Sequence, residues 1–292
     1  MPGSIGRTDT RLLRVQVREG TALVVRDVPL ETYTAVAALS EVHPAAGDED
    51  LAARVYAVQT VIARTYAVTN IGRHARDGFD LCPTTHCQLY EPARLASSRW
   101  AAVARAAAQR TAGEVLWFAD TPARAVFHAD CGGHTSNAAA VWGGVAPAYL
   151  AGRRDPVEPA AHSEWTFQPA TEALRAALNA DLRTAIGAKL EGIEVAGRDG
   201  AGRAEQIILR GSQTFVVRGE VFRDVVTRRL GARTLRSTLF SIKKTRDGFT
   251  FSGKGFGHGV GLCQAGALAR LKAGDSPEDV LAYYFPGTRL HK

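Results

Sequence analysis

The amino-acid sequence predicts an α+β fold of mixed helices and small antiparallel sheets, with a smaller α+β subdomain inserted into a main domain. Short alternating segments near the N-terminus indicate strands, and longer apolar segments after them indicate helices. From about residue 165 to residue 251 the chain is rich in strand-like segments and glycine turns. It then returns to a glycine-rich segment and a final helix. We therefore expect the main domain to span 11–165 and 252–292, and the insertion to span 166–251.

The N-terminal part predicts a hairpin followed by two helices. The segments LLRVQV and ALVVRDV alternate in polarity, which is typical of paired strands. Pro29 suits the first turn of a helix that carries Glu41. After a loop with helix-capping acids, residues 51–70 are apolar nearly all round, which predicts a helix buried on most sides, with Arg64 among its few polar residues.

The remaining elements follow in chain order. A further helix is expected over ARLASSRWAAVARAAAQRT, then strands over EVLWFAD and ARAVFHAD with a Thr-Pro turn between them. In the insertion, TEALRAALNADLRTAI predicts an amphipathic helix and LEGIEVAGRDGAGRAEQIILRGSQTFVVRG predicts strands joined by glycine turns. EVFRDVVTRRLG predicts a helix closed by glycine, and SPEDVLAYYF predicts the last helix.

Composition narrows the class of partner. The chain has 292 residues, 46% of them hydrophobic, with a net charge of +7 and a pI near 9.5. This balance favours anionic partners such as nucleic acid, a membrane surface or an acidic cell-wall polymer. The basic residues are scattered and not interleaved with aromatics, so we expect no nucleic-acid partner. We see no apolar stretch near the ~20 residues that a membrane span needs and no apolar signal-peptide core, so neither segment is expected in this chain.

A glycine cluster near the C-terminus, GKGFGHGVG, has the look of a phosphate-binding loop. Too few residues follow it for a βαβ unit, and it lacks the Lys-Ser/Thr pair, which disfavours nucleotide binding. Two interpretations are left. The loop brings its backbone close to a partner, with His258 and Gln264 as polar side chains, or it is a structural turn with a surface histidine.

Histidine and cysteine side chains gather in the segment HARDGFDLCPTTHCQLY. His74, Cys82, His86 and Cys87 fall within fourteen residues. Thiolates and imidazoles suit tetrahedral Zn²⁺, and four of them would close a structural site. A disulfide between Cys82 and Cys87 is the alternative in an oxidising compartment.

The segment FHADCGGHTSN places three more such residues close together. His128, Cys131 and His134 lie on a predicted strand and the turn after it, where they supply a fourth metal ligand or line a cleft. A Cys/His nucleophilic dyad built on Cys131 or Cys87 is disfavoured, because four cysteines with nearby histidines offer many accidental pairs.

Glu41 is a carboxylate in an otherwise small and apolar stretch, TAVAALSEVHP. At 100° per residue it projects from the same side of its helix as Leu30 and Thr34. Burial and the negative end of the helix dipole both raise the pKa of a glutamate above its usual ~4.3. A general acid at neutral pH needs that environment. The residues alone leave a second interpretation open, an ion pair with Arg64.

Six motifs occur in an order that points to a family: VPLETYTAVAALSEVHP, AVQTVIARTYAV, DLCPTTHCQLY, AVFHADCGGHTSNAAAVWGG, GKGFGHGVGLCQAGALA and YYFPGT. This series resembles the SpoIID/LytB family, bacterial proteins that act on peptidoglycan in sporulation or wall remodelling. The similarity covers most of residues 20–290 and is weakest in the insertion. Cys131 and His134 stand where the family often has serine and tyrosine.

The resemblance implies an extracytoplasmic lytic transglycosylase that cleaves the bond between N-acetylmuramic acid and N-acetylglucosamine. Glu41 matches the family's catalytic acid/base and Arg64 its motif arginine. Cys82, His86 and Cys87 match its zinc loop, with His74 as the upstream ligand. One carboxyl group suffices for this reaction, because the muramyl 6-hydroxyl closes a 1,6-anhydro ring. We expect Glu41 and Arg64 to be catalytic. Arg64, Gln88, His258 and Gln264 are expected to orient the glycan or to stabilise developing charge, and His134 to bind it.

Two other readings of the chain stay open. It is a non-catalytic wall-binding protein that enhances a partner amidase, a role that the resemblance also implies. Alternatively, it is a zinc-stabilised structural module in which Glu41 is only salt-bridged. The partners expected are therefore peptidoglycan glycan strands and a cell-wall amidase.

Overall fold

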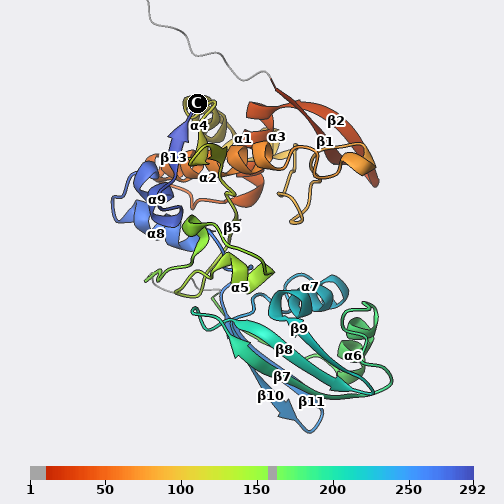
Figure 1. Ribbon diagram of the computed structural model, residues 1–292. Coiled ribbons are helices and arrows are strands. Elements are labelled where there is room, and N and C mark those ends of the chain that lie inside the picture. Colours follow the sequence, from red (N-terminus) through yellow and green to blue (C-terminus); the bar gives the residue numbers. More distant parts are fainter. Residues whose placement is uncertain (1–10, 157–162) are drawn as a thin grey trace, which may run out of the picture. The chain divides into compact units, whose positions relative to one another are not determined.

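The computed structural model describes residues 11–156 and 163–292 (Figure 1). They form two compact units. Unit 1 comprises the described residues up to Val126 together with Arg270–Lys292, and unit 2 comprises the described residues of Phe127–Ala269. The predicted fold class is confirmed, since helices mix with sheets of two or three strands whose pairs are antiparallel in the described residues, with one exception. The domain bounds expected from the sequence stay a prediction.

Unit 1 begins with the predicted hairpin. Strands β1 (Leu12–Glu19) and β2 (Ala22–Pro29) pair antiparallel along their whole length. Their turn contains Gly20 at φ +59°, a left-handed conformation that glycine adopts without a steric penalty. Alternate residues of β1, among them Leu13 and Val15, are buried in the core of this unit. The hairpin therefore anchors the segment from which the first helix starts.

Helix α1 (Leu30–Glu41) begins directly after Pro29, as the sequence predicts, and Glu41 is its last residue. Residues 33–40 are all buried, so the helix is enclosed on every side. Burial is therefore not limited to the side of the helix from which Leu30, Thr34 and Glu41 project. A helix made of alanine, leucine, valine and small polar residues can be surrounded because its side chains let neighbours approach closely.

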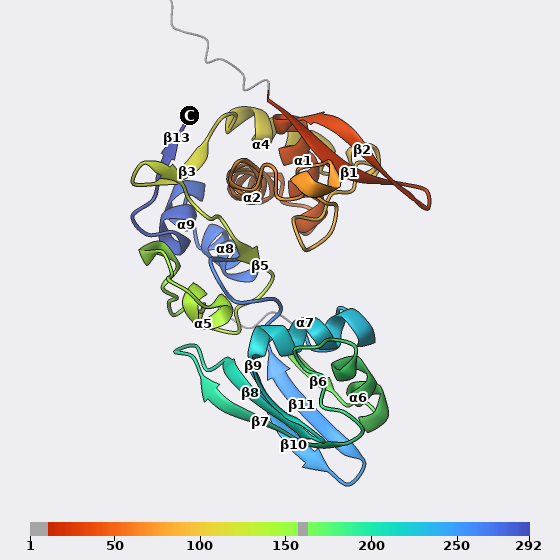
Figure 2. The same ribbon diagram turned by 45° about the vertical axis from the view of Figure 1, so that its right-hand side comes forward.

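Helix α2 (Glu49–Thr69) is the long buried helix that the sequence predicts. The Asp48 side chain caps it by accepting the N–H of Leu51 at 2.8 Å. α2 packs against α1 and against α4 (Ala101–Arg110), and Figure 2 shows the three helices side by side. Their close packing forms the frame that positions the two ends of α1.

The single helix predicted over residues 93–111 is wrong. The chain forms a short α3 (Arg94–Ser97) and a separate α4. Ser98 between them is extended, with ψ 132°, and its hydroxyl accepts the N–H of Trp100 at 3.2 Å. A serine that offers its side chain to a nearby backbone N–H favours such a helix break.

A small sheet completes unit 1. β3 (Val115–Phe118) lies between β4 (Thr121–Pro122) and the C-terminal β13 (Arg289–His291). The expected Thr-Pro turn is therefore wrong, because these two residues are the strand β4 and pair with β3. The turn lies one step earlier, where Ala119 has φ +50°. The backbone of β3 therefore forms hydrogen bonds to a strand on each side.

The last helices follow the glycine-rich segment. α8 (Gln264–Lys272) is followed by α9 (Pro277–Tyr284), which confirms the predicted final helix. The Ser276 hydroxyl accepts the N–H of Asp279 at 3.1 Å and the Asp279 carboxylate accepts the N–H of Ser276 at 3.2 Å. This reciprocal capping box explains why α9 starts at its proline.

In unit 2 the predicted strand over residues 123–130 is shorter than expected. Only β5 (Phe127–His128) forms, and it pairs in parallel with β12 (Leu262–Cys263). Helix α5 (Ala138–Trp142) and a 3₁₀ turn (Ala148–Leu150) follow it. The partner of β5 lies more than 130 residues away in sequence, so local pattern alone does not set the length of this strand.

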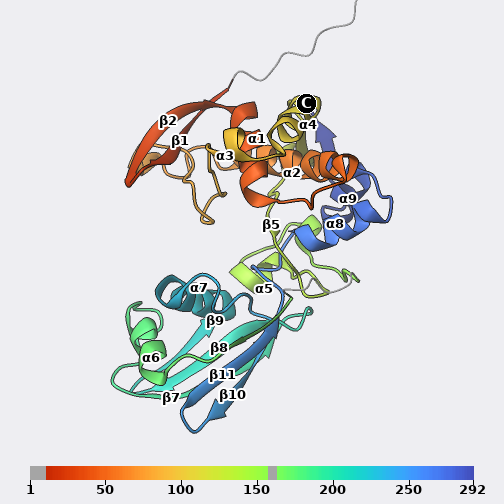
Figure 3. The same ribbon diagram turned by 180° about the vertical axis from the view of Figure 1, so that it is seen from behind.

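Two three-stranded sheets and two helices make up the rest of unit 2, in the region where the sequence predicts strands with glycine turns (Figure 3). The elements are β6 (Glu164–Phe167), β7 (Leu190–Arg198), β8 (Ala204–Gly211), β9 (Thr214–Arg218), β10 (Phe240–Thr245), β11 (Gly248–Lys254), α6 (Thr171–Asn179) and α7 (Gly219–Leu230). The sheet orders are β10-β11-β6 and β7-β8-β9, and α6 packs beside α7. The strands and the helix predicted here are confirmed.

Helix α6 is shorter than the helix predicted over residues 171–186. It ends at Asn179, whose side-chain amide donates to the carbonyl of Gly187 at 2.8 Å and accepts its N–H at 3.0 Å. This pair of hydrogen bonds offers the backbone an alternative to continuing the helix.

Candidate active site and metal centre

Glu41 sits at the C-terminal end of α1, where its carboxylate Oε1 accepts the backbone N–H of Leu89 at 2.6 Å. No ion pair to this carboxylate occurs in the described part of the chain. Burial raises the pKa of Glu41 to about 7, against the opposing effect of the Leu89 N–H and with a smaller increase from the Glu91 carboxylate. Glu41 can therefore both hold and release a proton near neutral pH.

Arg64 does not pair with Glu41, so that alternative is wrong. Its guanidinium forms a bidentate ion pair with Glu31 in the first turn of α1, at 2.9 Å from Nε and 2.5 Å from Nη2. It also donates to the carbonyls of Ala108 and Glu114, and its side chain is 0% exposed. These contacts fasten α1, α2 and the end of α4 together.

Gln88 lies next to the residue that holds Glu41. Its side chain is wholly buried, and its Oε1 accepts the Tyr33 hydroxyl at 3.0 Å. Tyr33 in turn stacks on Tyr90, with ring centroids 5.1 Å apart. The Nε2 of Gln88 has no hydrogen-bond partner among the described residues. The segment 88–90 is thus fixed on both sides of the Leu89 N–H, with one amide donor group left over.

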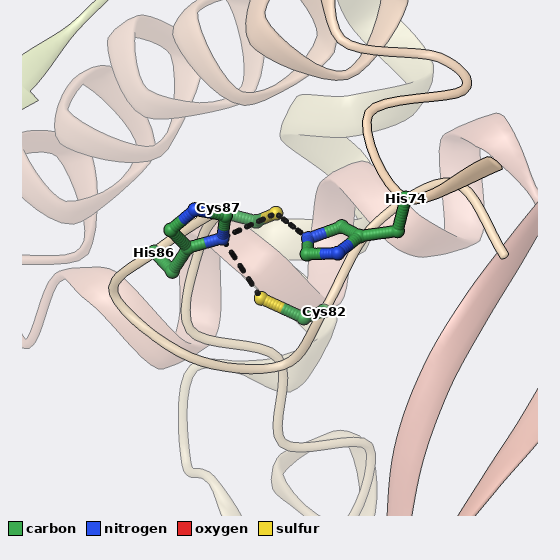
Figure 4. A group of neighbouring side chains, drawn as sticks. All are labelled: His74, Cys82, His86 and Cys87. Atoms are coloured by element: carbon green, nitrogen blue, oxygen red, sulfur yellow. Dashed lines mark hydrogen bonds between the residues drawn. The ribbon is translucent and has the colours of Figure 1, made fainter. Parts of the chain in front are cut away.

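The four predicted metal ligands come together in unit 1 (Figure 4). His74 Nε2 lies 3.3 Å from the Cys87 sulfur, and His86 Nδ1 lies 3.8 Å from the sulfur of Cys82 and 3.9 Å from that of Cys87. Tetrahedral Zn²⁺ with two sulfur and two nitrogen ligands separates neighbouring ligand atoms by about 3.5 Å. The donor set and its spacing therefore fit a zinc ion.

Outer contacts also suit a metal centre. The other ring nitrogen of His74 lies 3.5 Å from the carboxylate of Asp77, in the 3₁₀ turn Ala75–Asp77, as in many carboxylate–histidine–metal arrangements. Hydrogen bonding between the two sulfurs lowers the pKa of Cys82 and raises that of Cys87, so the pair favours one thiolate. Cys82 and Cys87 are not joined by a disulfide in the structure, which therefore differs from the disulfide alternative.

The metal group connects directly to Glu41 through the chain. Cys87 is followed by Gln88 and then by Leu89, whose N–H binds the Glu41 carboxylate. On the other side of the loop, the N–H of Gln16 in β1 donates to the carbonyl of Leu81 at 2.9 Å. A metal held by this loop would therefore set the position of the backbone donor that faces Glu41.

The glycine-rich segment lies in unit 2, and its glycines are required. The glycines with positive φ are Gly255, Gly257, Gly259 and Gly261. A Cβ on Gly257 would lie 2.7 Å from the His128 Cβ, and one on Gly259 would lie 2.4 Å from the Nε of Arg203. The backbone thus approaches other parts of unit 2 closely, and packing within the unit is enough to require glycine at these two positions. An approach of this loop to a partner stays a prediction.

His258 is half-buried in this segment and packs between aromatic rings. Its ring centroid lies 5.0 Å from that of Trp142 and 5.5 Å from that of His128. Burial lowers the pKa of His258 to about 4, so the ring is neutral at pH 7. Its Nδ1 accepts the N–H of Val260 at 3.0 Å, which leaves the proton on Nε2 and makes that atom a donor.

The other two expected glycan-binding residues also lie in unit 2. His134 is half-buried, with Nδ1 2.7 Å from the carbonyl of Thr135. Gln264 is the first residue of α8 and is half-buried. The structure thus places Glu41, Gln88 and the metal group in unit 1, and His134, His258 and Gln264 in unit 2.

Sequence reasoning missed several charged residues. Arg203 is buried, and its Nη2 donates to the carbonyl of Cys131 at 2.8 Å. Glu220 and Arg223 form a bidentate pair at 2.6 and 3.0 Å. Their i,i+3 spacing on a predicted helix could have indicated this pair. Arg203, in contrast, is one arginine among many in the sequence, and nothing local distinguishes it.

Two family models match the chain. One, described as Stage II sporulation protein, matches residues 18–118, which include Glu41 and the metal group. The other, described as a domain of unknown function (DUF8618), matches residues 159–261.

Stage II sporulation protein D of Bacillus amyloliquefaciens is 30% identical to the chain over 281 residues, covering 91% of the chain and 75% of that protein. The chain belongs to the SpoIID/LytB family. Stage II sporulation protein D of Bacillus subtilis (strain 168) is 29% identical to this SpoIID/LytB protein over 277 residues, again covering 91% and 75%. The amidase enhancer of the same organism is 27% identical over 275 residues, covering 80% of the chain but only 37% of the enhancer.

Membership of the SpoIID/LytB family confirms the recognition made from the motifs and supports a cell-wall-related role. In the described residues, no helix combines the length and the apolar character that crossing a bilayer requires.

Proposed function

We propose that this protein is a lytic transglycosylase that cleaves the β-1,4 bond between N-acetylmuramic acid and N-acetylglucosamine in peptidoglycan. The observation that carries the proposal is the state of Glu41. Its carboxyl group is half-buried at a helix end, faces one backbone N–H and has a pKa raised to about 7. A group with this pKa can serve first as an acid and then as a base.

The proposed reaction uses the carboxyl group of Glu41 twice, first as an acid and then as a base. The carboxylic acid protonates the glycosidic oxygen, and the bond from that oxygen to the muramyl C1 breaks. The Glu41 carboxylate then takes the proton of the muramyl 6-hydroxyl, whose oxygen bonds to C1. The products are a free N-acetylglucosamine 4-hydroxyl and a 1,6-anhydro-N-acetylmuramic acid end, and Glu41 is again protonated.

This reaction needs no second carboxylate, whereas ordinary glycoside hydrolysis generally uses two. Glu91 is the carboxylate whose charge affects the pKa of Glu41. Its carboxylate pairs with Arg94 at 2.5 Å and is engaged in that contact. The arrangement around Glu41 therefore favours the single-carboxyl mechanism.

We assign separate roles to the other expected site residues. Gln88 is wholly buried and bound to Tyr33, so we propose that it holds the segment of the Leu89 N–H in place, whereas the half-buried His258 is a proposed glycan contact. His134 and Gln264 are proposed as further glycan contacts. For Arg64 we propose a positioning role, because its guanidinium is occupied by Glu31 and two carbonyls.

A zinc ion would be held by His74, Cys82, His86 and Cys87. Four protein ligands leave no open position, so such an ion would supply structural stability and not a reactive water. Its proposed effect is to fix the segment that carries the Leu89 N–H.

Peptidoglycan glycan strands are the proposed substrate and the extracytoplasmic cell wall the proposed place of action. The net charge of +7 suits an anionic wall polymer. A second candidate function, a wall-binding enhancer of an amidase, is favoured by the similarity to the amidase enhancer of Bacillus subtilis.

Purified protein incubated with peptidoglycan, with and without prior removal of stem peptides, tests the proposal. Mass spectrometry should find 1,6-anhydro-N-acetylmuramic acid ends, and the variant Glu41→Gln should produce none above background. The control Glu191→Gln removes an exposed carboxylate in β7 and should retain full activity. Reducing muramic acid ends, or anhydro ends made equally by Glu41→Gln, would overturn the proposal.

The same preparation separates the second candidate function. An enhancer would accelerate a purified cell-wall amidase while releasing no anhydro sugar itself, and Glu41→Gln would enhance as well as the wild type. The transglycosylase proposal expects anhydro products without any amidase present.

A further inference from the structure

We propose that unit 2 contains a second metal site, in which His128, Cys131 and Cys263 bind Zn²⁺. Their ligand atoms all lie within 4.8 Å of one another, and all three residues are buried. None of them belongs to the loop group around His74, which lies in unit 1. The proposal does not depend on the transglycosylase activity.

The fold brings these residues together from two distant segments. In the parallel pair β5–β12, Cys263 is the register partner of His128. Cys131 follows three residues after His128, and its N–H donates to the Cys263 sulfur at 3.2 Å. Strand pairing therefore supplies two of the ligands and the turn after β5 supplies the third.

The His128 ring is prepared to bind a cation through one nitrogen. Nδ1 lies 3.1 Å from the carbonyl of Val260 and so carries the proton that it donates. Nε2 is then a lone-pair acceptor, and this buried atom has no hydrogen-bond partner in the described part of the chain. A buried acceptor without a donor is costly, and a metal ion would satisfy it. The Val260 carbonyl fixes the tautomer as second contacts do in known metal sites.

Backbone N–H groups point at both sulfurs. The Cys131 sulfur accepts the N–H of Gly133 at 3.3 Å, and the Cys263 sulfur accepts those of Cys131 and Gly266 at 3.2 and 3.4 Å. Such N–H···S contacts stabilise negative charge on sulfur, and they recur where thiolates hold metals.

A carboxylate and an arginine lie beside the three ligands. The Cys131 S–H donates to Oδ2 of Asp155 at 3.4 Å, and Asp155 is 0% exposed, but it does not belong to the group whose ligand atoms lie within 4.8 Å of one another. Two thiolates balance a dication, and the buried guanidinium of Arg203, which donates to the Cys131 carbonyl at 2.8 Å, offsets the charge of Asp155. Two sulfurs and one imidazole suit zinc among the common divalent ions, with a water molecule as the fourth ligand.

A disulfide between Cys131 and Cys263 is the competing outcome, since both sulfurs lie in the same cluster. It would leave the Nε2 of His128 without a partner and would give the N–H groups around the sulfurs no charge to stabilise. The metal accounts for both features, and we therefore favour it.

Zinc content of the full-length protein tests the proposal. Purified chain dialysed against Zn²⁺ should hold two ions, measured by elemental analysis and native mass spectrometry. Cys82→Ser/Cys87→Ser changes only unit 1 and should retain one ion. Cys131→Ser/Cys263→Ser should also retain one, and the control Ser136→Ala, a buried residue of unit 2, should retain both.

The unit 1 variant keeps the test decisive even when the unit 2 variant fails to fold. If Cys82→Ser/Cys87→Ser binds no zinc, the second site does not exist. If it binds one ion, His128→Gln added to that variant should remove it or weaken its affinity at least tenfold. Thiol counting in denaturant checks the competing outcome, and a Cys131–Cys263 disulfide in the metal-loaded protein would also overturn the proposal. None of these results depends on whether glycan is cleaved.

Discussion

The two ends of helix α1 each carry a glutamate, and their surroundings are opposite. Glu31 in the first turn meets the guanidinium of Arg64 in a bidentate pair and also accepts the N–H of Gly113 at 3.2 Å. Glu41 in the last turn meets one backbone N–H and no cation in the described residues. One carboxylate is held by a buried cation, and the pKa of the other is raised by burial.

The difference shows how a helix can separate structural and chemical roles. Glu31 lies at the positive end of the helix dipole and pairs with Arg64, while burial and the negative end of the dipole both oppose a charged Glu41. Burial raises the pKa of Glu41 to about 7, and no cation pairs with it in the described residues to oppose that effect. Each prediction below changes one side of this contrast.

The largest effect is expected for Glu41→Gln. Glutamine keeps the shape and the acceptor for the Leu89 N–H but has no proton to transfer. Loss of a general acid generally costs about 10²- to 10⁴-fold in rate, so kcat for anhydro-product release should fall by that range. Product release is measured by mass spectrometry, with circular dichroism to confirm folding. A variant with more than a tenth of wild-type kcat would contradict the role given to Glu41.

Glu31→Gln should lower the free energy of unfolding strongly, and it should not act directly on the reaction at Glu41. It leaves the buried Arg64 charge uncompensated, which generally costs about 3–5 kcal/mol. The free energy of unfolding from urea titration measures this loss. Glu19→Gln is the matched control, because it breaks the exposed Glu19–Arg26 pair of the hairpin and should cost under about 1 kcal/mol. Equal losses in the two variants would mean that Arg64 does not depend on Glu31.

Glu41→Gln should also stabilise the protein at high pH. Below pH ~4 both the folded and the unfolded glutamate are protonated, so the substitution has little effect there. As pH rises towards 7 the unfolded carboxyl ionises while the folded one keeps its proton, and stability of the wild type falls. Above pH 7 the penalty is complete, at about 3 kcal/mol, and glutamine removes it.

Urea titrations at pH 4.5 and pH 8.5 measure this difference. The stability gain of Glu41→Gln should be small at the lower pH and large at the higher one, while the exposed Glu191→Gln should show no such change. A gain that does not depend on pH would mean that the pKa of Glu41 is not raised.

Much of this contrast follows from the sequence, but the partner of Arg64 does not. Proline at position 29 sets the start of α1, and twelve residues then bring its end to Glu41, so the buried acid could be predicted. Glu31 and Glu41 lie on the same helix, and the packing register of α1 against α2 decides which of them faces Arg64. That register depends on contacts between distant residues, which helical periodicity does not contain.

The two groups of candidate metal ligands, the one around His74 and the one made of His128, Cys131 and Cys263, also differ in how far the sequence predicts them. Four ligands within one loop could be recognised from their spacing, because the chain between them is short. Cys263 lies 132 residues after Cys131, and only the two-residue pairing of β5 with β12 brings them together. The break at Ser98 rests on one local hydrogen bond that competes with the helix, and the turn at Ala119 rests on a left-handed backbone conformation that alanine rarely adopts, so neither follows from helix or turn propensity.

The smallest effect is expected when the proposed metal of the unit 1 loop is removed, and it should act on Glu41 through the backbone. Cys87 is two residues before Leu89, whose N–H lowers the pKa of Glu41 against the effect of burial. Cys82→Ser should loosen this donor, so the pKa of Glu41 should rise further and the fall in kcat at alkaline pH should begin at a higher pH. The maximal rate should drop only severalfold, because the acid itself is retained.

Rates between pH 5 and pH 10 for zinc-loaded wild type, Cys82→Ser and the exposed loop control Thr85→Ala measure this shift. Thr85→Ala should match the wild type, since it removes no ligand. A shift towards lower pH would contradict the role given to the Leu89 N–H, because loss of that donor can only raise the pKa of Glu41. If Cys82→Ser loses zinc and its pH profile is unchanged, the Leu89 N–H stays in place without the metal. Glu41 would then be as independent of the loop as Glu31 is at the other end of α1.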